Sequence, residues 1–250
     1  GHGGQVVLWA DGSTRALGQV SARGGAQGGN GGLIETSGQW LDVGGLRVDT
    51  RAPLGQIGTW LLDPADITIS GAVTTDATAT GGVFAPNSGV SAANINVADL
   101  VTALGGSNVA VSTENTGLSG AGLGDIDVNA AVTWTAPTTL TLNAARDVNV
   151  NQVITGTDGS LALNAGRNVT VGAAVTTTTG QLSFTAAQDV YINAATTITT
   201  GDLQAVAGRK VTVSAASSVT TGRMVLRADN DGTGPGAAEG TVDITCGSNC

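Results

Sequence analysis

Residues 178–222 read TTGQLSFTAAQDVYINAATTITTGDLQAVAGRKVTVSAASSVTTG, and the tripeptide TTG begins at 178, 199 and 220, a step of 21 residues each time. The same step relates three columns of apolar residues: Leu140, Leu161, Leu182, Leu203 and Met224; Val148, Val169, Val190 and Val211; and Ala144, Ala165, Ala186, Ala207 and Ala228. A fixed period of this length is typical of a solenoid, in which one structural unit repeats along an axis.

Within each unit, apolar and polar residues alternate, as in Leu161-Ala162-Leu163. A period of two indicates short strands with one buried face, and segments such as 164–168 between them are rich in turn-forming residues. One such unit cannot bury its apolar face alone. Stacking units about 4.8 Å apart buries a continuous apolar column and pairs the backbone of each coil with the next. The sequence therefore predicts an all-β fold, a parallel β-helix with about 21 residues per coil.

The repeat pattern divides the chain into three parts. Residues 125–250 carry the regular 21-residue repeats, interrupted by a loop at 229–240. Residues 1–73 are predicted to form irregular coils of the same kind with glycine-rich loops. Residues 74–124 interrupt the pattern, and we interpret them as an excursion from the solenoid, not a separate domain.

This insertion is predicted to contain one short helix at 91–104. Ser91 is a suitable N-cap residue, and Gly105 and Gly106 are placed to end the helix. The apolar residues between them follow helical spacing: Val97, Leu100, Val101 and Leu104.

The charge balance argues against several function classes. The chain has 10 Lys+Arg against 19 Asp+Glu, a formal net charge of −9, and so lacks the basic surface that nucleic acid binding requires. It has no run of about 18 apolar residues to insert into a membrane. The single histidine, His2, leaves little scope for histidine-based catalysis or zinc binding. Because the apolar columns lack a polar cap at either end, we expect a piece of a longer solenoid.

Three segments carry a family resemblance: VVLWADGSTRALGQVSARGGAQGGNGGLIETSG at 6–38, VDTRAPLGQIGTWLLDPADITI at 48–69 and GDIDVNAAVTWTAPTTLTLNAARDVNVN at 124–151. They resemble filamentous-haemagglutinin-like exoproteins of two-partner secretion systems. The resemblance implies a right-handed β-helical shaft from a large bacterial surface adhesin. It also implies export by an outer-membrane transporter, a secreted or cell-surface location, roles in cell attachment or biofilms, and a position downstream of the secretion domain. A host receptor or a polysaccharide is then a possible partner.

Parallel β-helices also include enzymes that cleave polysaccharides, which need acidic residues converging on one groove. Asp147 and Asp189 share one column, and three arginines occupy the neighbouring one: Arg146, Arg167 and Arg209. We favour a structural ladder at a repeat turn, in which these side chains bond locally and balance charge. We therefore expect no catalytic site and no cofactor, with a carbohydrate-binding or carbohydrate-cleaving β-helix as the alternative.

Two loops resemble ligand-binding motifs. The glycine-rich segment 24–32 lacks the lysine and the strand–helix context of a phosphate loop, so loop geometry explains it better. Asp229, Asn230 and Asp231 are followed by a glycine, as in part of a calcium loop, but no glutamate stands at the twelfth position. We expect no metal site, and calcium at these three residues remains the alternative.

Threonines form a ladder at one repeat position: Thr157, Thr178, Thr199 and Thr220. A second column, Thr179, Thr200 and Thr221, lies beside it and is broken by Asp158. Threonine suits strands and stacks well between them, so a structural ladder is favoured. The second alternative is an ice-binding face, because some ice-binding proteins present a flat threonine array on a β-helix.

The four tryptophans are predicted to divide by role. Trp9 and Trp60 lie in the family-like segments, and we expect them to fill the interior of the N-terminal coils. Trp40 and Trp134 are the candidates for exposed contacts with glycans, since an aromatic ring can stack on a sugar.

The two cysteines, Cys246 and Cys250, are separated by Gly-Ser-Asn. A turn at these residues permits the Cα separation of less than about 7 Å that a disulfide needs, and a disulfide suits an extracellular protein. We expect a bonded pair that staples a turn. The pair also resembles the C-terminal disulfide that anchors some two-partner adhesins, and that reading stays open.

Overall fold

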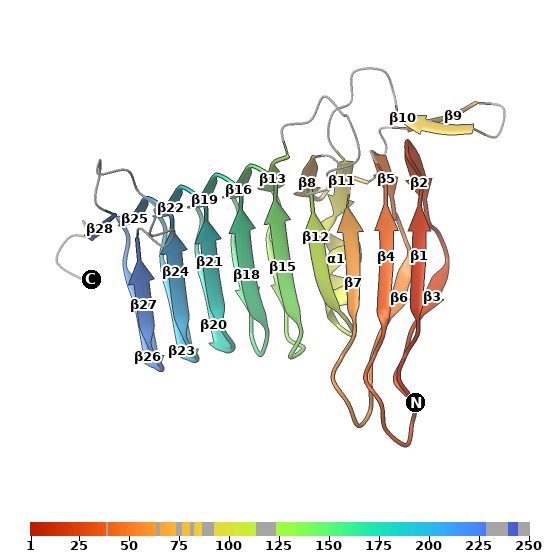
Figure 1. The fold of residues 1–250 in the computed structure, drawn as a ribbon, viewed down its shortest axis with the longest axis horizontal. Helices are drawn as coiled ribbons and strands as arrows, with labels where there is room; N and C mark the ends of the chain where they lie inside the picture. The colour runs from red at the N-terminus through yellow and green to blue at the C-terminus, as the bar shows by residue number, and fades with distance from the viewer. Residues whose placement is uncertain are drawn as a thin grey trace.

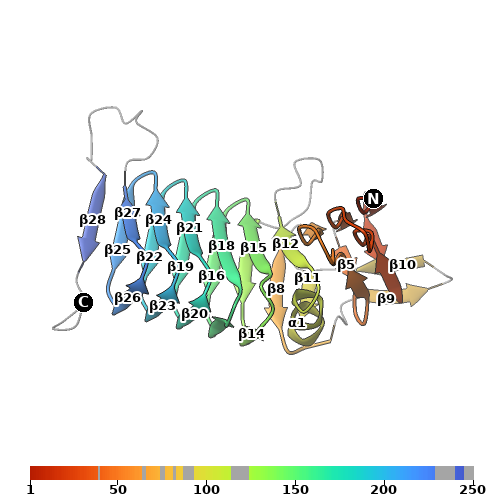
Figure 2. The same cartoon turned by 90° about the horizontal axis from the view of Figure 1, so that it is seen from below.

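The computed structural model describes residues 1–38, 40–63, 66–73, 77–80, 83–86, 93–113, 124–228 and 240–244. They form a right-handed parallel β-helix whose coils stack along the long axis of the molecule (Figure 1 and Figure 2). The predicted fold class is therefore confirmed.

Three parallel sheets form the faces of the helix. The first face has nine strands: β1 (Gln5–Trp9), β4 (Leu33–Ser37), β7 (Thr59–Asp63), β12 (Asn108–Ser112), β15 (Thr139–Ala144), β18 (Ser160–Ala165), β21 (Leu182–Ala186), β24 (Leu203–Ala207) and β27 (Met224–Arg227). The second face has eight: β11 (Ala93–Asn96), β8 (Ile67–Ser70), β13 (Ile126–Val128), β16 (Asp147–Val150), β19 (Asn168–Val171), β22 (Asp189–Ile192), β25 (Lys210–Val213) and β28 (Thr241–Ile244). The third face has five: β14 (Val132–Trp134), β17 (Ile154–Gly156), β20 (Val175–Thr179), β23 (Thr196–Thr200) and β26 (Ser217–Thr221).

The N-terminal coils continue the stack with smaller sheets. Here β2 (Ser13–Arg15) pairs in parallel with β5 (Trp40–Asp42), and β3 (Gln19–Ser21) pairs in parallel with β6 (Arg47–Asp49). The antiparallel hairpin of β9 (Ala77–Thr80) and β10 (Val83–Pro86) lies outside the three faces, where β10 contacts β2 (Figure 1).

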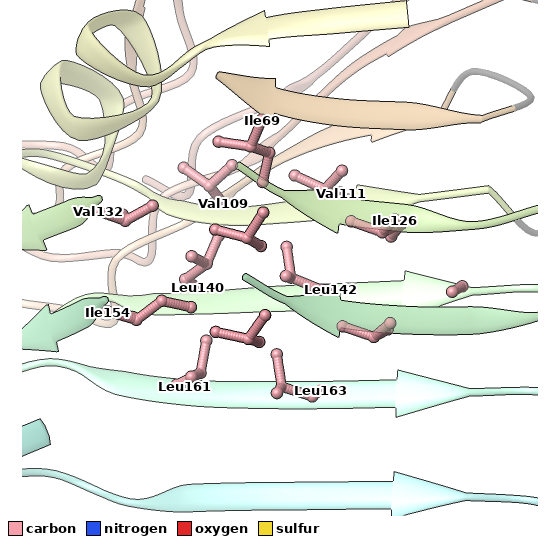
Figure 3. Close-up of a cluster of buried hydrophobic side chains, with 14 of the residues drawn as sticks. Ile69, Val109, Val111, Ile126, Val132, Leu140, Leu142, Ile154, Leu161 and Leu163 are labelled. Carbon is pink, nitrogen blue, oxygen red and sulfur yellow. The ribbon is translucent and has the colours of Figure 1, made fainter. Parts of the chain in front are cut away.

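The register of the sheets follows the sequence repeat. Leu161 pairs with Leu140 on one side and with Leu182 on the other, and all three side chains are buried. Figure 3 shows leucine, isoleucine and valine side chains from successive coils meeting in the interior. Burying one such side chain contributes about 1.5–3 kcal/mol, so the column of equivalent residues supplies the main stabilisation between coils.

The size of the buried side chains at one position differs from coil to coil. Leu163, Phe184 and Ala205 occupy one column, and each is fully buried. The large phenylalanine is followed by the small alanine, so the interior stays filled without forcing the backbones apart. After the loop, Val242 and Ile244 pair in register with Val211 and Val213.

The helix expected at 91–104 is present but shorter, because α1 spans Val97–Leu104. Its N-cap is Asn96, whose side chain accepts a hydrogen bond from the Ala98 N–H at 2.9 Å, and not Ser91, which lies outside the described residues. Leu100 and Leu104 are buried, and Gly105 follows the last helical residue, as predicted. Residues 93–96 form a strand instead of helix. The helix can begin after Asn96 because asparagine caps a helix as well as serine does.

The second half of the predicted insertion belongs to the stack. Strand β12 pairs with β7 and β15, and α1 packs between β6 and β14, where a strand of the third face would otherwise lie. Strand β11 pairs with β8 on the side away from β13, beside β5. The chain therefore turns back toward its N-terminus after β8 and lays down β11 out of sequence order. Within the described residues of 74–124, the β9–β10 hairpin is the part that forms its own sheet outside the stacked coils (Figure 1).

Deletion of residues 182–202 removes one complete coil, and we expect the shortened chain to fold. Gln181 then precedes Leu203, so the apolar column and the register are kept. Small-angle scattering should show a particle shorter by about 4.8 Å, with the β-sheet circular dichroism retained. Deletion of 182–191 is the matched control, because it places polar residues in the core. Loss of folded structure in both deletions would contradict a modular solenoid.

Candidate functional site

A column of ion pairs runs along the corner between the first and second faces. In each pair an arginine reaches back to an aspartate of the preceding coil, and we call this set the Asp–Arg ladder: Arg146 with Asp125, Arg167 with Asp147, and Arg209 with Asp189. The Nε atoms lie 2.6, 2.8 and 2.9 Å from the Oδ1 atoms, and Nη2 donates to Oδ2 in every pair. Such two-point pairing fixes both side chains.

Two aspartates of the ladder also bond to the backbone of the next coil. Asp147 Oδ1 accepts the Asn168 N–H at 3.1 Å, and Asp125 Oδ1 accepts the Asp147 N–H at the same distance. Burial acts to raise the pKa of Asp147, but the bonds from Arg167 and Asn168 outweigh it and leave the pKa below its usual value. Arg209 lowers the pKa of Asp189, helped by the Tyr191 hydroxyl, which donates to Asp189 at 2.9 Å.

These interactions give the ladder the structural role predicted from the sequence. Asn168 separates Asp147 from Asp189 in their shared column, so the two carboxylates do not converge on one substrate position. A general acid needs a carboxyl group that holds its proton near neutral pH, whereas both pKa values are lowered. The ladder is therefore suited to holding coils together, and its chemistry does not match that of a glycosidase acid.

The threonine ladder lies at one end of the third-face strands. Thr178, Thr199 and Thr220 are exposed and Thr157 is partly buried. The N–H groups of Thr178 and Thr179 both donate to Thr157 O, at 3.0 and 2.8 Å, which marks a β-bulge. Because consecutive side chains both face solvent there, the strand bends between the two threonine columns. The second column pairs in register between coils, Thr179 with Thr200 and Thr200 with Thr221. The surface bends where an ice-binding face needs to be flat.

Trp134 is buried, and its predicted role as a glycan contact is wrong. Its side chain is only 3% exposed, and Nε1 donates to Thr138 O at 3.3 Å. Gly156 and Gly159 of the next coil lie against the ring, where a Cβ would come within 2.7 and 2.1 Å of ring atoms. Glycine at these two positions therefore makes room for the indole.

The remaining tryptophans also differ in exposure. Trp60 is buried and donates through Nε1 to Thr36 Oγ1 at 3.1 Å, as expected for a residue that fills the interior. Trp9 is 53% exposed, contrary to expectation, because Val6 and Leu8 of β1 face inward and place Trp9 on the outer side. The side chain of Trp40 lies outside the described part of the chain.

The glycine-rich segment 24–32 is held by backbone bonds within the N-terminal coils. The N–H groups of Gly31 and Gly32 donate to Gln56 O and Ala22 O, at 2.8 and 2.7 Å. A Cβ on Gly31 would lie 1.9 Å from Thr50 O, so the glycines allow neighbouring backbones to touch. The N–H groups that a phosphate loop would offer to a ligand are used inside the protein, which supports the interpretation from loop geometry.

The other predicted sites cannot be placed. Asp229, Asn230 and Asp231, the calcium alternative, and Cys246 and Cys250, the predicted disulfide, lie outside the described residues. Within the described residues, no group of three or more His, Cys, Asp or Glu side chains is arranged to hold a metal ion. The imidazole of His2 accepts the Asn30 N–H at 3.1 Å through Nδ1.

Two grooves lined by described residues lie on the outer surface, and sequence reasoning missed both. The arginine groove, of about 370 Å³, lies between β3–β6 and the end of α1 and is lined by Gln19, Arg47, Asp49, Arg51 and Thr102 among others. A second groove, of about 280 Å³, is lined by Ser183, Gln204, Arg223 and Arg227 from β21 to β27. The arginine groove exists only because α1 packs over β6, a contact that no sequence pattern indicated.

No protein-family model matches the chain, and no curated protein matches it. In the part of the chain that the structure describes, no helix combines the length and hydrophobicity needed to cross a membrane.

Replacing Trp134 with alanine should lower the free energy of unfolding by about 3–5 kcal/mol, because it leaves a cavity between two coils. Trp9→Ala is the control and should change it by no more than about 0.5 kcal/mol, as for most exposed residues. Urea unfolding followed by circular dichroism measures both values. Comparable losses in the two variants would contradict the assignment of Trp134 to the core.

Asp189→Asn should lower the free energy of unfolding at pH 7 by about 1–2 kcal/mol, since Arg209 loses a charged acceptor at a partly screened site. The folded protein holds the pKa of Asp189 below its unfolded value. The stabilisation is therefore present above an unfolded pKa of about 4 and is lost as the pH falls toward the folded pKa.

Urea midpoints measured from pH 7 down to about pH 2 report this dependence. The wild-type midpoint should fall as the solution is acidified, and the fall should be smaller for Asp189→Asn. Asp11→Asn, at an exposed bend, is the control and should keep the wild-type profile. Identical profiles for all three chains would rule out this role for Asp189.

Proposed function

We propose that the chain is a non-catalytic shaft segment of a secreted bacterial adhesin of the filamentous-haemagglutinin-like kind. The observation that carries this proposal is the unbroken parallel ladder from β1 to β27 along the first face. Hydrogen bonds between coils run along the axis of the molecule, so the ladder resists stretching and bending. A protein built in this way is suited to hold a binding surface away from a cell.

The outer surface supports the same proposal. Outward positions are filled by polar ladders between coils, such as Asn164 Nδ2 to Asn143 Oδ1 at 2.7 Å and Asn149 Nδ2 to Asp127 Oδ1 at 2.9 Å. These contacts add to the cohesion between coils. The described carboxylates that the sequence suggested for catalysis are tied into the Asp–Arg ladder. The proposed partners are an outer-membrane two-partner-secretion transporter during export and a host receptor or polysaccharide at the cell surface.

Export and adhesion can be tested with the chain fused downstream of a two-partner secretion domain and produced with its transporter. We expect surface exposure, shown by protease accessibility on intact bacteria, and increased attachment of these cells to epithelial cells or to biofilm matrix. The matched control carries the 182–191 deletion, which disrupts the stack. Retention of the intact fusion inside the cell, or equal attachment with both fusions, would contradict the proposal.

Catalysis is tested separately with the purified chain. A reducing-sugar assay over a panel of polysaccharides should show no turnover. Release of reducing ends from any of them would favour the carbohydrate-cleaving alternative over the shaft.

A further inference from the structure

The arginine groove is a concave polar surface on an otherwise regular shaft. One wall is the ribbon of β3 and β6, and the other is the C-terminal end of α1 with Gly105 and Gly106. Among the described residues that line it, Val48 is the one with an apolar side chain. A groove of this composition is suited to a ligand that has both hydrogen-bonding groups and apolar faces.

Two guanidinium groups, those of Arg47 and Arg51, line this groove, and that of Arg23 pairs with the same Asp49 carboxylate as Arg51. The side chains of Arg23, Arg47 and Arg51 are 44%, 57% and 56% exposed, whereas those of their partners Asp49 and Asp99 are 13% and 19% exposed. The carboxylates thus lie beneath the arginines. A ligand that approaches the groove meets positive charge first.

The arginines keep hydrogen-bond donors free for a ligand. Arg51 donates Nε and Nη2 to Asp49, at 2.9 and 2.7 Å, and Arg23 donates Nη1 to the same carboxylate at 2.7 Å. Arg47 makes one long contact with Asp99, at 3.4 Å. A guanidinium carries five N–H donors, so each arginine retains N–H groups that have no protein acceptor among the described residues. The Asp49 carboxylate holds two of the three arginines in place.

The local charge favours a ligand with an isolated negative group. Three arginines against two carboxylates leave a local charge of +1, within a chain of formal net charge −9. The acidic surroundings repel densely charged polyanions, while short-range pairing with the arginines remains favourable. A carboxylate matches the guanidinium fork, which can bind both of its oxygens.

The neutral groups of the groove favour a sugar over a peptide. Gln19 presents an amide with donors and an acceptor, and Thr102, whose hydroxyl donates to Ala98 O at 2.7 Å, keeps its oxygen as an acceptor. These groups are suited to ring hydroxyls.

We propose that the arginine groove binds an acidic sugar, with the carboxylate of a uronic acid residue held by Arg47 and Arg51. The ring hydroxyls then face Gln19 and Thr102. The site adds a ligand to the shaft proposed above and does not depend on export or attachment, because the purified chain contains the whole groove.

Titration of the ¹⁵N-labelled chain with galacturonic acid, followed by NMR, tests this site. We expect saturable shifts of the Gly105 and Gly106 amides and of the Arg47 and Arg51 side-chain signals. Galactose is the matched neutral sugar and should leave them unchanged. Arg47→Gln together with Arg51→Gln should weaken binding about tenfold or more, because each loses a charged donor.

Two further variants keep the result interpretable. Arg223→Gln together with Arg227→Gln, in the second groove, should bind as the wild type does. Arg47→Gln alone removes an exposed side chain with one long contact, and it should keep the fold and still bind less tightly. Equal shifts with galactose, unchanged affinity in the groove variants, or binding of triglutamate in place of galacturonic acid would each overturn the proposal.

Discussion

Hydrogen bonding between successive coils is the interaction on which the rest of this structure depends. For the backbones to pair at every layer, each coil must present almost the same cross-section as its neighbours. This requirement explains the constant step of the repeat in the regular part of the chain. It also explains the glycine beside Trp134 and the alanine beside Phe184, since a large side chain in one coil is matched by a small one in the next.

The same stacking creates an electrostatic problem, because identical residues in adjacent coils bring like charges together. In the column that begins β16, β19, β22 and β25, Asn168 separates Asp147 from Asp189, and Lys210 follows. At the N-terminal end of this column Asp125 and Asp147 stand in adjacent coils. Each of these three aspartates is paired with an arginine of the following coil, which offsets the repulsion. Charge is thus retained at the corner only where it is neutralised within the stack, which is consistent with the low charged fraction of 12%.

The repeat predicted the fold well because residues at equivalent positions of successive repeats become neighbours in adjacent coils. The columns of Leu161, Val169 and Ala165 specify both the strands and their partners. The alternation of inward and outward side chains along a strand could have predicted the exposure of two tryptophans. Val132 faces inward, and so does Trp134 two residues later. Leu8 faces inward, so Trp9, the next residue, faces outward. The arginine groove could not be foreseen, because it depends on where α1 packs.

Strand β11 is the one described strand of the second face that lies out of sequence order, on the N-terminal side of β8. Its place beside β5 and β8 can be filled only after the chain has been made as far as Asn96. Assembly of the shaft from its N-terminus therefore has to wait at this point while about one coil's length of chain is added. Because β11 packs beside β5 and β8, the N-terminal coils are complete only when residues of the later insertion have been added.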